Sequence, residues 1–358
     1  MLIARAPMRI SFGGGGTDLE AYYAKHGGLV ISTTINKYFY VIITSDESDD
    51  LQVISADYRS LFRSSPYTDL FWNGDLALPK AILHHFGIDR GINMFLASEV
   101  PPGTGLGSSS AAAVTLVQAL STLLERPMTK QQMAELASSI EITKMGMPIG
   151  KQDQYASSFG GLNKIIFTNE GVTVEPINIA SNVRQTLEQQ LMLFFTGCSR
   201  ESSSILKHQR KSTQNQDASV LKALHTIKQI AVEIHACLEQ GNLDEFARLL
   251  HCSWQEKQRL APGLSTSFID TCYGLALEHG AMGGKITGAG GGGFLMLYCH
   301  EQLQDAVTTA LEEQGLIRMN FRFDQQGAKV LLNVANFDTL CGASHAEPVS
   351  QLQQGIQD

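Results

Sequence analysis

The chain carries Pro101-Pro102-Gly103-Thr104-Gly105-Leu106-Gly107-Ser108-Ser109-Ser110-Ala111 directly before Ala111 to Glu125, a segment with apolar residues at helical spacing. Glycines let backbone amides turn inward, and the first N–H groups of a helix favour an anion. A tight helix entry with a serine cap is the alternative, but it requires one glycine at most. The three alternating glycines and three serines therefore predict a phosphate-binding loop. Because no Gly-Lys-Ser/Thr of a Walker loop follows, a metal and other cations must compensate the phosphate charge.

Two further stretches are rich in glycine. The first, Ser11-Phe12-Gly13-Gly14-Gly15-Gly16-Thr17-Asp18, follows an expected strand and Arg9. Four successive glycines supply no packing side chain, so a ligand against bare backbone and a flexible turn are both open interpretations. The second, Gly283-Gly284-Lys285-Ile286-Thr287-Gly288-Ala289-Gly290-Gly291-Gly292-Gly293-Phe294, precedes an apolar strand, where a flexible linker is unusual.

Two acidic residues follow the phosphate loop. Glu141 comes after the apolar Ile140 on an expected helix, and Asp153 follows a glycine and proline break, with Lys151 two residues before it. A carboxylate pair after a phosphate loop suits one Mg²⁺ ligand and one group that orients or deprotonates a hydroxyl, as phosphoryl transfer requires. The alternative is that Glu141 is a solvated helix residue and Asp153 a helix cap.

The order of expected elements indicates an α+β fold, because strands and helices do not alternate regularly. Strand patterns dominate the start, and a long helix with apolar residues at three and four spacing covers 218–240. We expect one domain over 1–180, a second over 181–340, and a polar tail over 341–358. Further expected strands lie at 2–5, 29–35, 38–44, 51–55, 162–167, 172–177, 191–196, 294–299, 318–323 and 329–334, and further helices at 130–140 and 302–314.

The amino-acid composition argues against several classes of binding partner. The 358 residues include 33 glycines and carry a net charge of −8 without a basic block, which argues against nucleic acid. No apolar run is long enough for a membrane span. Six cysteines without a CxxC pair, and no signal-peptide pattern, favour reduced thiols and a cytoplasmic location. We expect a small-molecule partner, and the sequence leaves the oligomeric state open.

The three loops, in their order along the chain, resemble the motifs of the GHMP kinase superfamily. This superfamily includes galactokinase, homoserine kinase, mevalonate kinase and phosphomevalonate kinase. The motifs are Ala6 to Asp18, Pro101 to Ala113 and Lys285 to Phe294, so the resemblance spans nearly the whole chain. It implies the GHMP kinase fold, in which a ribosomal-protein-S5-like N-terminal domain is joined to a ferredoxin-like C-terminal domain.

The resemblance also implies roles for residues. ATP phosphates would lie on the second motif, Mg²⁺ would be held by Glu141 with Ser109 or Ser110, and Asp153 would be the catalytic aspartate. Arg9 or Lys151 would stabilise the charge that develops. The expected ATP contacts are Pro102, Gly103, Thr104, Gly105, Leu106, Gly107, Ser108, Ser109 and Ser110, and the expected acceptor contacts are Gly14, Gly15, Gly16, Thr17, Asp18, Arg200, Gly288, Ala289, Gly290 and Gly291.

One departure bears on the substrate. Galactokinases have a Glu-His pair where this chain has Gly15 and Gly16, which disfavours galactose. The segments 149–156, 159–163 and 195–200 look most like the D-glycero-D-manno-heptose 7-phosphate kinase branch, which phosphorylates the anomeric hydroxyl of a sugar 7-phosphate. A second phosphate on the substrate requires its own cations. The unassigned candidates are Lys37, Lys151, Arg200 and Lys207.

We therefore expect an ATP-dependent sugar kinase that acts on the anomeric oxygen of heptose 7-phosphate. An L-fucose kinase or other sugar 1-kinase is the nearest alternative. A non-catalytic sugar sensor on the same scaffold and an ATP-using decarboxylase of a phosphorylated acid are alternatives from other classes.

Overall fold

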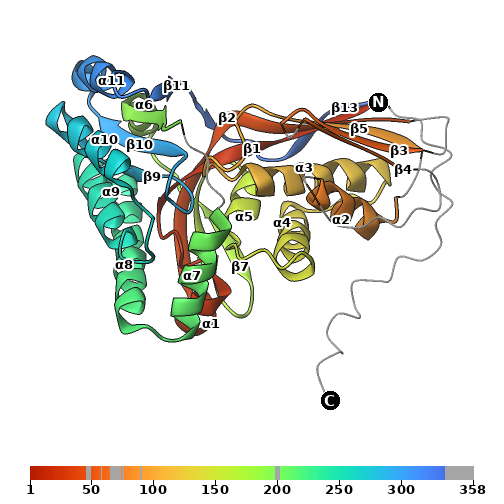
Figure 1. Ribbon diagram of the computed structural model, residues 1–358, viewed down its shortest axis with the longest axis horizontal. Helices are drawn as coiled ribbons and strands as arrows, with labels where there is room; N and C mark the ends of the chain where they lie inside the picture. Colours follow the sequence, from red (N-terminus) through yellow and green to blue (C-terminus); the bar gives the residue numbers. More distant parts are fainter. Residues whose placement is uncertain are drawn as a thin grey trace.

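The structure is a computed structural model that describes residues 1–45, 50–57, 59–64, 74, 76–88, 91–197 and 202–334. The candidate Arg200 and the tail expected over 341–358 lie outside the described residues. The described chain forms two bodies that lie side by side, each built on its own sheet (Figure 1). In the described part, no helix is long and apolar enough to cross a membrane.

The first body is built on a nine-stranded sheet. Its long central strands pair antiparallel, and the register between them shifts at Pro7, which has no N–H to donate to the ladder. The main strand order is β13-β1-β2-β5-β3-β4, with β6 and β12 also on β2 and β7 on β6. The strands are β1 (Leu2–Gly13), β2 (Gly28–Ser45), β3 (Leu51–Ser55), β4 (Ser60–Ser64), β5 (Ile92–Ser98), β6 (Leu162–Phe167), β7 (Val172–Pro176), β12 (Phe323–Asp324) and β13 (Lys329–Asn333).

Helices cover one face of this sheet (Figure 1). The central helix, α3 (Ser108–Leu123), is buried along most of its length, and its run of small residues Ala111 to Ala113 lets it approach the strands closely. Thr129 and Gln132 form the capping box that the sequence predicts at the start of the next helix. The other helices of this layer are α2 (Ala77–Phe86), α4 (Lys130–Ser138), the π-helical turn η1 (Ser139–Lys144) and α5 (Gln152–Phe159).

The second body contains a four-stranded antiparallel sheet in the order β11-β8-β10-β9. Helices separate its first strand from its second and its third from its fourth, which is the ferredoxin-like connection. The strands are β8 (Leu191–Phe195), β9 (Ala281–Ile286), β10 (Phe294–Cys299) and β11 (Ile317–Met319). The helices are α6 (Ser181–Gln190), α7 (Ser202–Gln214), α8 (Ala218–Gln240), α9 (Leu243–Lys257), α10 (Ser267–Glu278), η2 (Glu301–Leu303) and α11 (Gln304–Glu312).

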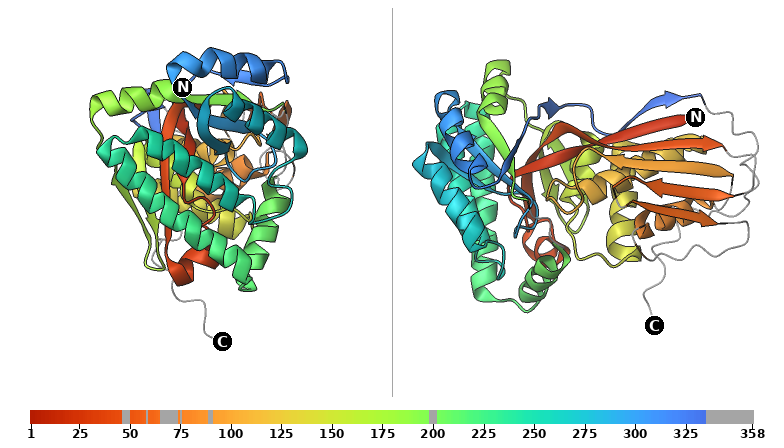
Figure 2. Two further views of the ribbon diagram at one scale, coloured as in Figure 1. Left: turned by 90° about the vertical axis from the view of Figure 1, so that its left-hand side faces the viewer. Right: turned by 45° about the horizontal axis from the view of Figure 1, so that its top comes forward.

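The two bodies share an extensive interface. Helix α8 packs on β1 and β2, and Figure 2 shows α8 and α9 lying across the end of the first sheet. Phe12 at the end of β1 makes an edge-to-face contact with Phe246 of α9. Strands β12 and β13 fall in the range expected for the C-terminal domain, yet they pair with β2 and β1 of the first sheet. The α+β class expected from the sequence is confirmed.

Candidate active site

The predicted phosphate-binding loop lies at the N-terminus of α3. Gly103, Gly105 and Gly107 all have positive φ, which a residue with a Cβ rarely adopts. Gly107 occupies the N-cap position, and no side chain caps the helix and no acidic residue lies in its first turn. The amides of Ser108 to Ser110 have no partner within the helix, so the loop and the helix end can accept an anion.

The third glycine-rich stretch along the chain, 283–294, packs directly on this loop. The carbonyl oxygen of Thr104 accepts the N–H of Phe294 at 3.2 Å and the hydroxyl of Thr287 at 3.3 Å. A Cβ on Gly293 would lie 2.2 Å from that oxygen, and a Cβ on Gly288 would lie 2.4 Å from the Cα of Gly105. Part of the glycine content is therefore required for loop packing, because side chains would separate the two loops.

Glu141 lies on the π-helical turn η1 and is 1% exposed, so it is not a solvated helix residue. Its carboxylate accepts the hydroxyl of Ser109 at 2.8 Å and the amide Nε2 of Gln154 at 2.6 Å. Burial raises the pKa of Glu141, while the hydrogen bonds from Gln154, Ser109 and Ser110 oppose the shift. Two serine hydroxyls and a buried carboxylate beside a phosphate loop are the hard oxygen ligands that Mg²⁺ prefers, so these residues fit the expected metal.

Asp153 lies in the first turn of α5 and is bound by Arg9 of β1 rather than capping the helix. The Nε and Nη2 of Arg9 donate to the two carboxylate oxygens of Asp153, each at 2.8 Å. The Nη1 of Arg9 donates to the carbonyl oxygen of Gly105 at 2.6 Å. A planar bidentate pair fixes the orientation of both groups, and the link to Gly105 places them beside the phosphate loop.

Asp18 forms a second buried carboxylate site next to this pair. Its oxygens accept the N–H of Gly16 at 2.9 Å and both the N–H and Nε2 of Gln152, at 3.3 and 3.1 Å. Burial raises the pKa of Asp18, and the negative charge of Asp153 raises it further. A Cβ on Gly150 would lie 1.9 Å from Asp18 Oδ2, so only glycine leaves room for this carboxylate.

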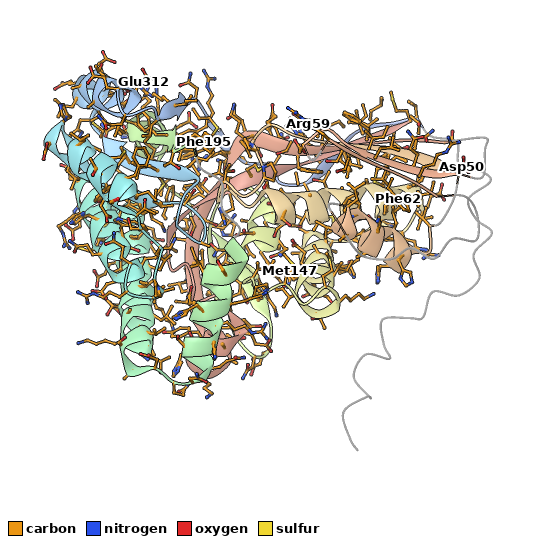
Figure 3. All side chains as sticks on the ribbon, in the orientation of Figure 1. Asp50, Arg59, Phe62, Met147, Phe195 and Glu312 are labelled. Carbon is orange, nitrogen blue, oxygen red and sulfur yellow. The ribbon has the colours of Figure 1, made fainter. Side chains whose placement is uncertain are left out.

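The phosphate loop, the Arg9–Asp153 pair and Asp18 line one cavity of about 570 Å³. Glu141 does not line it but accepts a hydrogen bond from Ser109, which does. Figure 3 labels one lining residue, Met147. The sequence-predicted residues that line the cavity are Arg9, Gly15, Gly16, Asp18, Pro102, Gly103, Gly105, Gly107, Ser108, Ser109, Ser110, Asp153, Gly288 and Ala289.

Other predicted residues have different surroundings. Thr17 is fully buried and its hydroxyl bonds to the backbone of Gly14 and Leu29. The ammonium of Lys151 lies 5.2 Å from the centre of the Tyr23 ring. Gly14 contacts Leu29, Gly290 and Gly291 contact Leu264, Leu106 is in the core, and the hydroxyl of Thr104 bonds to Pro101.

Sequence reasoning missed several polar residues of the cavity. Its lining includes Lys257, Lys285, Gln152 and Gln209. Gln154 donates a hydrogen bond to Glu141. Lys257 ends α9 and Lys285 lies in β9, so their convergence depends on the packing of the second body against the first. Lys285 and Gln152 lie in stretches that the sequence singles out, but no local pattern shows that their side chains face the cavity, and none marks Lys257 or Gln209.

A smaller cavity of about 80 Å³ adjoins the phosphate loop through Pro102, Ser108 and Ser109. Its other walls are mostly apolar, but Asp57 also lines it. Asp57 Oδ1 accepts the N–H of Ser98 at 3.2 Å, its Oδ2 has no partner, and burial raises the pKa of this carboxyl. The remaining lining residues are Phe39, Ser55, Leu76, Leu78, Pro79, Leu96, Ala112 and Leu116.

The chain is similar in sequence to known proteins along most of its length. Residues 76–161 match the GHMP kinases N terminal domain, and residues 234–316 match the GHMP kinases C terminal model. A D-glycero-alpha-D-manno-heptose 7-phosphate kinase from Campylobacter jejuni is 32% identical over 91% of this chain and 97% of its own length. An L-fucokinase/L-fucose-1-P guanylyltransferase from Bacteroides fragilis is 25% identical over 82% of this chain, which spans 34% of that relative.

A solved structure shows that the similarity includes the fold. The crystal structure of a D-glycero-D-manno-heptose 1-phosphate kinase from Bacteroides thetaiotaomicron superposes with a TM-score of 0.79. It is 28% identical to this chain and the match covers 94% of this chain and all of that one. The resemblance that the three loops indicate is confirmed, and the chain belongs to the GHMP kinase family.

Proposed function

We propose that the protein transfers the γ-phosphoryl group of ATP to the anomeric hydroxyl of D-glycero-D-manno-heptose 7-phosphate. Membership of the family makes it a kinase that phosphorylates an alcohol group. The observation that carries the proposal is the Arg9–Asp153 pair, held beside the open amides of the phosphate loop in one cavity with Asp18. The pair supports a role for Asp153 in orienting a hydroxyl between the phosphate loop and the acceptor end of the cavity, which is the part lined by Gly15, Gly16 and Asp18.

The residues divide the work of the reaction. The amides of Ser108 to Ser110 and the end of α3 bind the transferred phosphate. Asp153 accepts a hydrogen bond from the attacking hydroxyl and orients it, and Arg9 stabilises the charge that develops on the phosphoryl oxygens. The hydroxyl proton passes to the Asp153 carboxylate as the new O–P bond forms and the bond between the γ-phosphorus and ADP breaks. An anomeric hydroxyl is more acidic than an ordinary alcohol, so positioning supplies much of the rate.

Glu141, Ser109 and Ser110 are the residues that would hold Mg²⁺. The metal supplies charge compensation for the ATP phosphates in phosphoryl transfer. The buried carboxylate of Glu141 accepts hydrogen bonds from Ser109 and Gln154. Gln154 thereby positions Glu141 toward the phosphate loop.

The smaller cavity supports binding of the nucleoside part of ATP. It opens beside the same loop, its apolar walls suit a planar base, and the unpaired Oδ2 of Asp57 can accept a hydrogen bond from an exocyclic amine. The nucleotide would then extend from this cavity along the loop toward the Arg9–Asp153 pair.

The choice of sugar rests on the relatives. Two of them are kinases of phosphorylated heptoses, and both match nearly the whole chain. Gly15 leaves the acceptor end open, since a Cβ there would meet its nearest neighbour, Ser11 Oγ, only at 3.9 Å. An L-fucose 1-kinase is the second candidate, which the Bacteroides fragilis relative favours.

An ADP-release assay over sugars and sugar phosphates tests the proposal. We expect the highest kcat/KM with D-glycero-D-manno-heptose 7-phosphate, and ³¹P NMR should show a new phosphate on the anomeric carbon. Higher kcat/KM with L-fucose would favour the second candidate. ADP release with none of the sugars, despite ATP binding, would contradict both, and CO₂ release from a phosphorylated acid would indicate a decarboxylase.

A further inference from the structure

Two buried lysines from the second body face the acceptor end of the cavity. Lys257 is 8% exposed and Lys285 is 2% exposed, and both line the cavity. The Nζ of Lys285 donates to the carbonyl oxygen of Phe12 at 3.3 Å. The Nζ of Lys257 donates to the carbonyl oxygen of Ile286 at 3.3 Å and to that of Gly288.

The partners of these lysines do not neutralise their charge. Among the described residues, neither lysine forms an ion pair with a carboxylate. Burial lowers the pKa of Lys257 to about 7 and that of Lys285 well below its usual value, and repulsion from Arg9 adds to both shifts. Buried cations without an anion are costly, and packing alone would be served better by apolar side chains. Each ammonium has three N–H donors, so donors also remain free on both.

Lys285 contacts the first glycine-rich loop, at the acceptor end of the cavity, and Lys257 reaches Gly288, which packs on the phosphate loop. Lys257 is attracted by Asp18 and repelled by Arg9, and Lys285 contacts Phe12 of the first glycine-rich loop. The groups that act on Glu141 are instead Gln154, the two serines and Asp153. Neither lysine hydrogen-bonds to Glu141, and their contacts are with backbone carbonyl oxygens, so no contact within the described residues assigns them to the metal-binding residues.

Other unpaired polar groups lie at the same end. Gln209 of α7 is 4% exposed and its Nε2 has no partner, and it is so close to Gly16 that a Cβ there would lie 2.4 Å away. Ser11 is 6% exposed and its hydroxyl has no partner either. Both residues line the cavity. Buried donors are normally satisfied, so these groups indicate a polar ligand with several acceptors.

We propose that Lys257 and Lys285 form the subsite that binds a phosphate carried by the acceptor sugar, with Gln209 and Ser11 as additional donors to that sugar. The inference rests on the proposed function and assigns residues to its substrate phosphate. A bound phosphate dianion supplies the missing counter-charge, which favours the protonated form of both lysines, and it then accepts charge-assisted hydrogen bonds from both ammonium groups. Of the cations expected from the sequence, Lys207 is exposed and Lys151 lies against Tyr23.

Calorimetric binding tests this assignment without requiring turnover. The ligands are D-glycero-D-manno-heptose 7-phosphate, the same heptose without phosphate, and a non-hydrolysable ATP analogue. In Lys257→Met and Lys285→Met we expect affinity for the sugar phosphate to fall by about 10- to 100-fold, because each charged hydrogen bond contributes about 1.5–3 kcal/mol. Affinity for the free sugar and for the ATP analogue should change by less than about threefold. Lys222→Met, exposed on α8, is the matched control and should change none of them.

The outcomes separate the inference from the proposed function. Equal losses for sugar and sugar phosphate in the lysine variants, or no greater affinity of the unmodified protein for the phosphorylated sugar, would overturn the inference. A loss confined to the ATP analogue would assign the lysines to the γ-phosphate and also overturn it. Lys257→Gln retains a donor to the loop carbonyls, so a selective loss in this variant excludes misfolding as the cause. Failure of ADP release with every sugar would contradict the proposed function and leave the binding comparison decisive.

Discussion

The Arg9–Asp153 pair makes a prediction at the scale of a single side chain. Asp153→Asn keeps the shape of the group and one acceptor for Arg9, but it removes the charge that orients the hydroxyl and balances the guanidinium. We expect kcat to fall by about 10²-fold or more with the KM for ATP nearly unchanged. Asp305→Asn, exposed on α11, is the control and should retain full kcat. Near-normal turnover of Asp153→Asn would remove this residue from the mechanism.

Glu141 makes a second prediction, which concerns both metal dependence and stability. Glu141→Gln should raise the Mg²⁺ concentration for half-maximal activity by about 10-fold or more. An unchanged Mg²⁺ titration would show that Glu141 does not hold the metal. In Glu141→Gln, the side-chain amide of Gln154 can rotate so that its Oε1, which has no partner, accepts the N–H of the new amide.

The stability effect of Glu141 follows from its raised pKa. Below about pH 4.3 the carboxyl is protonated in both the folded and the unfolded chain. As the pH rises through that value, the unfolded chain releases its proton first, so the free energy of unfolding falls until the folded group also ionises. In metal-free buffer, Glu141→Gln should therefore have a higher Tm than the unmodified protein above this pH. Equal Tm values from pH 4 to 8 would contradict this explanation.

Gly150 provides a prediction at the scale of an element, the turn that enters α5. It has no left-handed φ, so the effect of a side chain there is steric: a Cβ would lie 1.9 Å from Asp18 Oδ2. Gly150→Ala should displace Asp18 from its hydrogen bonds with Gln152 and lower kcat/KM for the sugar by about 10- to 100-fold. The KM for ATP should change by less than about twofold, because the phosphate loop is untouched.

Gly274 of α10 is the matched control for Gly150. A Cβ there meets no heavy atom within 4 Å, so Gly274→Ala should leave kcat/KM unchanged and raise stability by up to about 1 kcal/mol through helix propensity. Equal activity of Gly150→Ala and Gly274→Ala would show that the turn can hold a side chain at Gly150, contrary to the short distance between its Cβ and Asp18 Oδ2.

Local patterns predicted the elements whose signals are local. The capping box at Thr129, the hairpin of β6 and β7, and the amphipathic α8 all have residue spacings that define them. The strands expected over 29–35 and 38–44 are one strand, β2, because β1 pairs with it on both sides of Asn36, where the register shifts, while β6 pairs with its first half and β5 with its second. The π-helical turn at Glu141 has no comparable sequence signal.

The candidate site was predictable to a similar extent. Glycine-rich loops and the acidic pair have marked local sequences, so the sequence predicts that Asp153, Glu141 and the serines belong to one site, which stays a prediction. The sequence does not predict that the lysines reach the cavity, since the last turn of a helix is an ordinary place for Lys257 on the surface and Lys285 appears only as part of the third glycine-rich stretch. What buries Lys257 and Lys285 is the contact between the two bodies, which involves residues 200 or more positions from the first loop.

At the scale of the whole molecule, the chain returns to its starting sheet after completing the second body. Tyr38 donates its hydroxyl to Asp324 Oδ2 at 2.7 Å, and the hydroxyl of Thr34 donates to the Asp324 carbonyl oxygen at 2.8 Å. Strand β13 covers the edge of β1 over Leu2 to Arg5. The C-terminal strands therefore connect the two bodies, and the strand that carries Arg9 is stabilised by residues more than 300 positions later.

A chain ending at residue 320 tests this dependence, because it retains the second body but lacks β12 and β13. It exposes the edge of β1 and leaves the hydroxyls of Tyr38 and Thr34 without their acceptors. We expect Tm to fall by about 10 °C or more, since several ladder hydrogen bonds and buried contacts are lost together. Leu331→Ser, at an exposed position of the same strand, should shift Tm by less than about 3 °C. A truncated chain that keeps both its Tm and its affinity for an ATP analogue would show that the first sheet is complete without its last strands.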